Sequence, residues 1–353
     1  IFLFYVYKYI LITMLRHKKI NKLFELWLII SLFLVFFIII IGGLTRLTNS
    51  GLSITEWELF KGILPPLNAE IWNNYFNLYK DIPQYKLVNS NMSLDEFKII
   101  FYWEYFHRIL GRFIGLFFLF SLIYFHLKKT VDKRYLQVGN LVFALICIQG
   151  LIGWYMVESG LINNISVSHY RLSLHLLIAF IIISIIFWLL ISLRNNNLKS
   201  FFVLSKKNLP YLILIFLILA QIIFGAFVSG LDAGKIYQTW PLMGYSYFPN
   251  DFTVENILHI FDFNNHSLVQ FYHRNLAYLI SIYIIFLTLH IFLKKNKRLY
   301  KPLFILLFFV LLQIFLGVLT LISGLNIFLA SAHQIGSVFL VFTSINLYYC
   351  HIK

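Results

Sequence analysis

The chain has 353 residues, of which 60% are hydrophobic and 12% are charged, and its mean hydropathy is +0.80. Soluble globular proteins carry about 45–50% apolar and about 25% charged residues, so this composition excludes a soluble enzyme, a nucleic-acid-binding module and a disordered tail. The formal net charge of +15 indicates basic inner loops of a membrane protein rather than an anionic partner. Cys147 and Cys350 lie in apolar runs, which excludes a disulfide framework and a thiolate metal cluster.

Hydropathy predicts an all-α integral membrane protein that is surrounded by membrane lipid. A helix needs about 20 apolar residues to cross a bilayer, and backbone groups in hydrocarbon must be paired within the protein. The stretch from Ile1 to Thr13 is too short, carries Lys8 and lacks a cleavage site, so we do not expect a signal peptide, and Met14 is an alternative start. Eight segments qualify as transmembrane helices, at about 24–44, 106–127, 137–159, 169–193, 208–230, 271–293, 302–323 and 330–350.

The distribution of Lys and Arg predicts the orientation of these helices. The two termini and the loops on their side carry 19 of these cations, and the opposite loops carry six. Both termini are therefore expected in the cytoplasm of a bacterium, with the chain in the inner (plasma) membrane, or in the matrix if the membrane is the mitochondrial inner membrane. This orientation predicts a cytoplasmic N-terminal segment at 1–23 and a cytoplasmic linker at 194–207.

Two long outer loops, at about 45–105 and 231–270, have room for structure outside the membrane. Ser93 followed by Glu96 is a capping box, which predicts a helix that runs directly into the second span. Tryptophans in or beside these loops are either an interfacial aromatic belt or face a substrate. They are Trp57, Trp72, Trp103 and Trp240.

An internal repeat divides the chain into two halves. The run Glu104 to Arg108 (EYFHR) corresponds to Gln270 to Arg274 (QFYHR), and the run Gln149 to Gly153 corresponds to Gln313 to Gly317. A third Gln-x-x-x-Gly closes the fifth span at Gln221 to Gly225. A repeat of this kind predicts two pseudo-symmetric four-helix bundles, at 24–193 and 208–353.

Four histidines occupy equivalent depths in the even-numbered spans. Each half offers two imidazoles at one level, and a pair of imidazoles above and below a porphyrin is how helical bundles hold haem iron. Zinc is disfavoured because neither half supplies a third ligand at a recognisable spacing. His169 competes with His175 but lacks a partner in the repeat. The predicted iron ligands are His107 with His175 and His273 with His333.

Three arginines stand beside these histidines. Arg108 and Arg274 each follow the first histidine of a half, and Arg171 lies one helical turn before His175. Arginine suits bidentate pairing with carboxylates, so these residues are predicted to contact haem propionates. The alternative is anchoring of the helix ends at the lipid headgroups.

The two halves differ at one chemically important position. Glu104 stands three residues before His107, whereas the equivalent residue before His273 is Gln270, which cannot ionise. A carboxylate beside a porphyrin can stabilise developing positive charge or accept a proton. We therefore expect chemistry in the N-terminal half and a permanent cofactor in the C-terminal half. The alternative for Glu104 is a solvated residue at a helix start.

Motifs in both halves resemble the haem A synthase family. They include Gly42 to Trp57 (GGLTRLTNSGLSITEW), Glu104 to Arg108, Gln149 to Leu161 and His169 to His175. The second half adds Gly225 to Gly234, Trp240 to Met243, Gln270 to Arg274 and His333-Gln334, so the resemblance runs from about residue 24 to the end. The absence of a cysteine pair in an outer loop resembles the alphaproteobacterial and mitochondrial branch.

The resemblance implies an oxidoreductase that converts the C8 methyl group of haem O, through an alcohol, to the formyl group of haem A. It implies that His107 and His175 hold the substrate haem, that Glu104 is catalytic, and that His273 and His333 bind a haem b cofactor. Haem O synthase, an electron-transfer partner and a second copy of the chain are further partners that it allows. Either water captures an electrophilic carbon beside Glu104, or an iron-oxo species hydroxylates the methyl group.

Two other classes of protein compete with this interpretation. A di-haem cytochrome b subunit relays electrons, but it usually carries its haems near opposite membrane faces, whereas all four histidines here lie at the outer level. A transporter with two related halves is expected to show broken helices and polar groups at the midplane. The spans show neither feature clearly.

Overall fold

The computed structural model describes residues 2–56, 61–129, 131–162, 164–251 and 260–352, with side chains from Lys22 onward. Within those residues the chain is helical, apart from turns and an isolated bridge between Met243 and Ser246. Eight helices are long and apolar enough to cross a membrane, which confirms the predicted spans. They are α1 (Phe2–Leu47), α4 (Leu94–Lys128), α5 (Lys133–Glu158), α6 (His169–Arg194), α7 (Leu209–Gly230), α8 (His266–Leu293), α9 (Tyr300–Ile322) and α10 (Ile327–Ile352).

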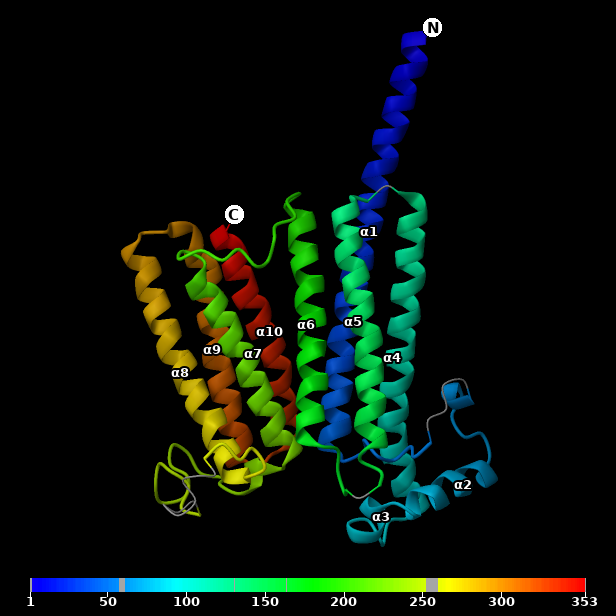
Figure 1. Cartoon of the computed structure of the whole chain (residues 1–353), viewed down its shortest axis with the longest axis vertical. Helices are drawn as coiled ribbons and strands as arrows, with labels where there is room; N and C mark the ends of the chain where they lie inside the picture. The colour runs from blue at the N-terminus through cyan, green and yellow to red at the C-terminus, as the bar shows by residue number, and fades with distance from the viewer. Residues whose placement is uncertain (1, 57–60, 130, 163, 252–259, 353) are drawn as a thin grey trace.

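Short helices in the connections complete the fold. In α1 the apolar span is Lys22–Leu47, and the preceding turns continue the same helix beyond the bundle (Figure 1). Helices α2 and α3 lie at the opposite end of the bundle from the ends of the chain, which we call the outer end, following the predicted orientation (Figure 1). The short elements are η1 (Lys61–Ile63), α2 (Ala69–Lys80), α3 (Pro83–Leu87), η2 (Ala233–Lys235) and η4 (Lys297–Leu299).

Helix α4 begins at the predicted capping box. The Ser93 side chain accepts a hydrogen bond from the Glu96 amide, and Glu96 Oε2 accepts one from the Ser93 amide at 2.8 Å. These bonds satisfy amides that have no partner within the helix. The prediction that this helix continues into the second span is confirmed, and His107 consequently lies well inside α4 rather than near its start.

A small aromatic core holds α2 against the outer part of α4. Trp72 is 8% exposed, and its ring centre lies 5.0 Å from that of Phe101. Phe76 and Tyr79 of α2 pack on Phe97 of α4 in the same cluster. Trp72 therefore serves as a core residue of the cluster that packs α2 on α4. Trp240 is 47% exposed, and Trp57 lies outside the described residues.

The long helices form two rings of four with the same order of contacts. In the N-terminal half α1 contacts α4, α4 contacts α5, α5 contacts α6, and α6 returns to α1. The C-terminal half repeats this order with α7, α8, α9 and α10. The two rings stand side by side in Figure 1 and meet where α6 contacts α7 and α1 contacts α10.

Close backbone approaches join the halves at both of these contacts. A Cβ atom built on Gly43 of α1 would lie 1.8 Å from Gln334 Oε1 of α10, and Gln334 Nε2 donates to the Ile39 carbonyl at 2.9 Å. At the other contact, a Cβ on Gly230 of α7 would lie 2.6 Å from His169 Cβ of α6. At Gly230 the neighbouring atoms belong to the backbone and Cβ of His169, so only glycine fits there, whereas a side chain at Gly43 would have to displace the end of the Gln334 side chain.

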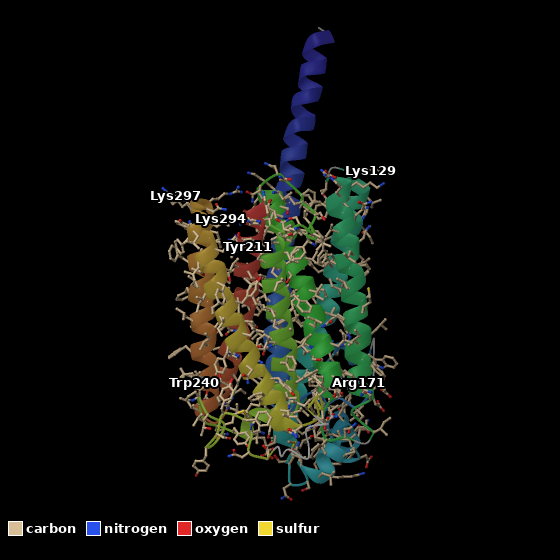
Figure 2. The ribbon with its side chains drawn as sticks, turned by 60° about the vertical axis from the view of Figure 1, so that its left-hand side comes forward. Lys129, Arg171, Tyr211, Trp240, Lys294 and Lys297 are labelled. Carbon is tan, nitrogen blue, oxygen red and sulfur yellow. The ribbon has the colours of Figure 1, made fainter. Side chains whose placement is uncertain are left out.

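Helix α1 starts and α10 ends at the same end of the bundle, as an even number of spans requires (Figure 1). Figure 2 places Lys129, Lys294 and Lys297 near that end, and Trp240 and Arg171 near the outer end. This separation fits the predicted orientation, whose assignment to a cytoplasmic face stays a prediction.

Candidate functional site

The first pair of predicted ligands comes together in the N-terminal ring. The rings of His107 on α4 and His175 on α6 have centres 6.4 Å apart and planes inclined by 62°. A metal–imidazole bond is about 2 Å long, so two imidazoles that bind one iron from opposite sides have ring centres about 6 Å apart. His175, rather than His169, therefore stands opposite His107 at a separation suited to one iron.

Each of the four histidines lies against a glycine of a neighbouring odd-numbered span. A Cβ atom built on Gly42 of α1 would lie 2.9 Å from His107 Cε1. The corresponding distances are 3.0 Å from Gly153 to His175, 3.1 Å from Gly225 to His273 and 3.0 Å from Gly317 to His333. A methyl group at these positions would press on the imidazoles. The glycines were visible in the repeat, but their contact with the histidines could not be read from it.

The glutamine of the Gln-x-x-x-Gly motif fixes the backbone of a histidine. Gln149 Nε2 donates to the carbonyl of His175 at 2.8 Å, and Gln221 Nε2 donates to the carbonyl of His273 at 2.9 Å. Residues four apart share a helix face, so these two motifs each place their glutamine and glycine against one histidine. Helix α1 carries Ile38 at this position, so its Gly42 packs on His107 without a glutamine four residues before it.

The imidazoles fit a haem group. In all four histidines Nδ1 is buried without a hydrogen-bond partner, and Nε2 is absent from that set of buried nitrogens. Nδ1 therefore faces the protein, and Nε2 is the nitrogen that could bind iron. In His273 the Gln221 Nε2 atom lies 3.4 Å from this nitrogen. The described residues contain no group of three or more His, Cys, Asp or Glu side chains that could hold a metal ion, whereas haem iron needs only two axial ligands.

Glu104 is buried in the N-terminal half, with 3% of its surface exposed. Its Oε2 accepts hydrogen bonds from Ser53 Oγ at 2.7 Å and from the Ile54 amide at 2.9 Å. Its Oε1 accepts from Arg108 Nη2 at 2.6 Å and Nε at 3.0 Å. Both oxygens are therefore occupied, and the alternative of a solvated helix-start residue is wrong, because α4 begins at Leu94.

The equivalent position in the C-terminal half is also buried but uncharged. Gln270 is 2% exposed, and its Nε2 donates to the Tyr237 carbonyl at 2.8 Å. Arg274 donates to the same carbonyl from Nη2 at 3.0 Å. In this half a backbone oxygen takes the hydrogen bonds of both side chains, and no carboxylate takes part in these bonds. The chemical difference between the halves is thus built into their packing.

The three arginines predicted to contact propionates all have protein partners. Arg108 donates to Glu104 and to the Ile54 carbonyl at 2.9 Å. Arg171 donates to Ser159 Oγ at 2.5 Å, with its guanidinium 4.6 Å from the centre of the Tyr155 ring. Propionate contact remains a prediction for Arg108, Arg171 and Arg274.

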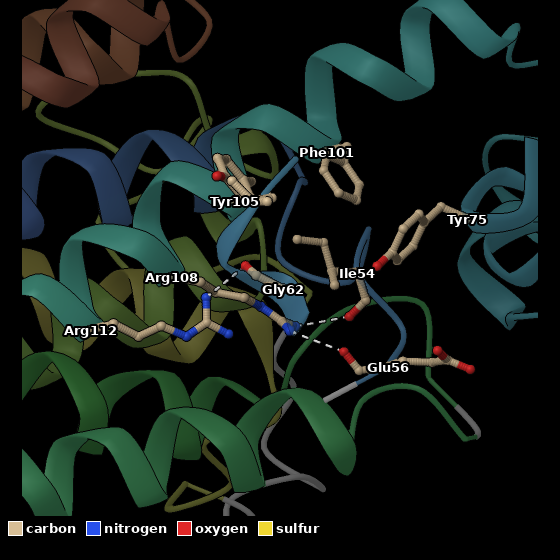
Figure 3. A pocket seen from close by; sticks show the side chains of 9 residues that line it. Ile54, Glu56, Gly62, Tyr75, Phe101, Tyr105, Arg108 and Arg112 are labelled. Atoms are coloured by element: carbon tan, nitrogen blue, oxygen red, sulfur yellow. Dashed lines mark hydrogen bonds between the residues drawn. The ribbon is translucent and has the colours of Figure 1, made fainter. Parts of the chain in front are cut away.

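An outer pocket lies beside Arg108 (Figure 3). Its volume is about 320 Å³, part of which is open to solvent. Ile54, Tyr105 and Arg112 also line it, and Arg112 Nη1 donates to the Gly62 carbonyl at 3.1 Å. The pocket therefore adjoins the polar group around Glu104 from the side of the first outer loop.

The fold and the facing imidazoles of His107 and His175 define a multi-pass helical membrane protein with a histidine pair in its N-terminal ring whose spacing suits one iron. The model of the COX15-CtaA family, described as cytochrome oxidase assembly protein, matches residues 25–345. Haem A synthase of Pelagibacter ubique is 50% identical over 323 residues, which cover 90% of this chain and 93% of that protein. Haem A synthases of Rickettsia bellii and Nitrosomonas eutropha are 42% and 43% identical, covering 89% and 90% of this chain and 94% and 90% of theirs. The chain belongs to the haem A synthase family.

Proposed function

We propose that this chain oxidises the C8 methyl group of haem O to the formyl group of haem A, through a hydroxymethyl intermediate. In this proposal His107 and His175 hold haem O, and His273 and His333 hold a haem b cofactor. The reaction takes place near the outer end of the helices, in a bacterial inner membrane with both termini in the cytoplasm. The names of the relatives support the reaction, and the spacing of the first imidazole pair supports the haem site.

The observation that carries the assignment of the two halves is the buried carboxylate of Glu104. It lies on the same helix as His107, whereas the C-terminal half has Gln270 in its place. A fixed negative charge stabilises positive charge that develops on a nearby carbon. The N-terminal half is therefore proposed to hold the substrate, and the other half to hold the cofactor.

Bound haem b would accept and pass on single electrons. The residues of this chain bind and orient the two haems, and the Glu104 carboxylate places a negative charge beside the substrate. Because Arg108, Ser53 and the Ile54 amide already donate to both Glu104 oxygens, the resting geometry favours an electrostatic role. A proton can reach the carboxylate only when one of these donors moves away.

The histidine pairs are tested by exchanging one ligand in each half of the full chain. Purified His107→Ala and His273→Ala proteins are supplied with haem O, and the extracted haems are identified by chromatography. We expect His107→Ala to lose haem O and haem A but to keep haem b, and His273→Ala to lose haem b but to keep haem O. Loss of the same haem from both variants would contradict the assignment of the halves.

The oxygen source distinguishes the two chemical schemes. The reaction is run in ¹⁸O-labelled water, and the hydroxymethyl intermediate is isolated. The intermediate carries the label if water captures an oxidised carbon. Label that comes only from dioxygen would contradict capture by water and support hydroxylation. A purified protein that contains haem b alone and makes no haem A would support the electron-relay alternative instead.

A further inference from the structure

We propose that Arg46 is a positioning residue that holds the outer ends of the two halves in register. Its effect on haem O oxidation rests on the proposed function, whereas its effect on the arrangement of the halves does not. Arg46 lies in the last turn of α1, and 11% of its side chain is exposed. A nearly buried arginine at a junction needs several acceptors, because its five N–H donors are costly to leave without partners.

The same turn follows the first helix of each half. Asn49 after α1 and Asp232 after α7 stand at the same distance in sequence from Gly42 and Gly225, the glycines that pack on the first histidine of each half. Both residues adopt the left-handed helical backbone conformation, with φ of 53° for Asn49 and 52° for Asp232. Asn and Asp tolerate this conformation better than other non-glycine residues.

Arg46 binds both of these turns. Nη1 donates to Asn49 Oδ1 at 2.8 Å in its own half. Nη2 donates to the Ser229 carbonyl at 2.5 Å and lies 3.3 Å from both the Gly230 carbonyl and Asp232 Oδ1 in the other half. The last carbonyls of a helix carry partial negative charge and lack helical partners, so a cation is stabilised there. The planar guanidinium can serve both turns at once.

One arginine serves both halves. The position in α7 that corresponds to Arg46 is Ser229, whose own carbonyl is one of the acceptors. The contact is thus asymmetric, and it reaches from the N-terminal half into the C-terminal half. His169 of α6 packs against Gly230 in the same turn. The end of α7 is therefore held by two helices of the N-terminal half.

The segment that Arg46 holds leads directly to Glu104. Asn49, whose carbonyl also accepts from Gln84 Nε2 at 3.1 Å, is followed by Ser53 and Ile54, which donate to the Glu104 carboxylate. A shift of the α7 turn relative to Asn49 would displace these donors. Arg46 thereby links the position of the C-terminal half to the geometry of the carboxylate beside His107.

The test compares Arg46→Gln and Asp232→Asn with Arg134→Gln in the full chain. Arg134 is the matched control, because it also pairs with an aspartate, Asp132, at 2.8 Å but is 68% exposed at the other end of the molecule. Nitroxide labels on Ile99→Cys in α4 and Phe328→Cys in α10, at positions that are 62% and 81% exposed, report the distance between the halves. Cys147 and Cys350 are first changed to serine.

We expect Arg46→Gln to broaden or shift the distance distribution and to slow haem A formation about ten- to hundredfold, since a misplacement of about 1 Å can cost about that much. Asp232→Asn keeps the carbonyl acceptors of α7 and should show a smaller change of both quantities. Haem content per chain should stay unchanged, because Arg46 donates its hydrogen bonds to the turns after α1 and α7 and to none of the four histidines. The control should match the parent protein in all three measurements.

An unchanged distance distribution in Arg46→Gln would overturn the proposal, whatever the reaction rate. A changed distribution with an unchanged rate would overturn the link to the reaction. If the parent protein makes no haem A, the proposed function fails, and the distance measurement still decides the role of Arg46.

Discussion

Arg108 and Glu104 form a buried ion pair within α4, with Nη2 and Oε1 2.6 Å apart. The two residues lie one helical turn apart, and the side chains of Arg108 and Glu104 are 11% and 3% exposed, respectively. The carboxylate next to His107 is consequently balanced by a positive charge within its own helix. Breaking such a pair by removing one partner leaves an uncompensated charge in a poorly solvated place.

Glu104→Gln and Arg108→Gln should therefore each destabilise the protein, by about 3 kcal/mol, while the double variant loses less than the sum. Haem A formation should be lost in Glu104→Gln and should stay lost in the double variant, since restored packing does not restore the charge. Thermal unfolding in detergent and a haem A assay measure the two effects. Additive losses of stability would contradict a direct pair, and normal activity of Glu104→Gln would contradict its catalytic role.

The contact between Gly153 and His175 predicts a large effect of one methyl group. Gly153→Ala should displace the imidazole and weaken haem binding in the N-terminal half, because the new Cβ would lie 3.0 Å from Cε1. Gly150→Ala is a matched control in the same helix, since nothing lies within 4 Å of its added Cβ. Titration with haem O, followed in the Soret band, compares them. Equal binding by both variants would rule out the steric contact.

The glutamines of the repeated motif should act each on its own half. Gln149→Leu removes the bond to the His175 carbonyl, and Gln221→Leu removes the bond to the His273 carbonyl. A hydrogen bond of this kind contributes about 1 kcal/mol, so retention of the corresponding haem should weaken about fivefold. Haem retention after dilution into detergent is measured for each variant. An effect of Gln149→Leu on haem b alone would contradict the assignment of this contact.

The second outer loop should loosen in acid through Asp251. Burial tends to raise the pKa of this carboxyl, but hydrogen bonds from Ser267 Oγ at 2.6 Å and Tyr237 Oη at 2.7 Å outweigh burial and lower the pKa. A carboxyl with a lowered pKa stabilises the folded loop above its unfolded pKa, near 4, and this stability is lost as the pH falls through the folded pKa.

Thermal unfolding between pH 7 and pH 3 measures this effect against Asp251→Asn, which cannot ionise. We expect the parent protein to lose more stability on acidification than Asp251→Asn does. Parallel curves for the two proteins would show that the ionisation of Asp251 does not stabilise the loop.

The sequence was sufficient for those features that depend on local patterns. Hydropathy located all eight spans, and the Ser93–Glu96 pair located the start of α4, because both depend on neighbouring residues. The repeat was sufficient to single out His107 and His175, whose ring centres the fold then brings within 6.4 Å of each other. Equivalent positions in a repeat occupy equivalent depths, so this inference needed no knowledge of helix packing.

The partners of these residues could not be predicted, because they come from distant parts of the chain. Ser53 and Ile54 reach Glu104 from the first outer loop, and Arg46 reaches Asp232 across about half of the sequence. No periodic pattern encodes such contacts. The role of Gly43 likewise depends on the approach of α10 to α1, which only the assembled bundle determines.

The contact between Gly43 and Gln334 has a consequence for biosynthesis. Gly43 belongs to the first of the eight described spans, and Gln334 belongs to the eighth. The first helix can therefore complete its packing only after the final helix has entered the membrane. Until then the N-terminal half lacks a neighbour that donates to its backbone at Ile39, so haem loading of the nascent chain should follow, rather than precede, insertion of the eighth span.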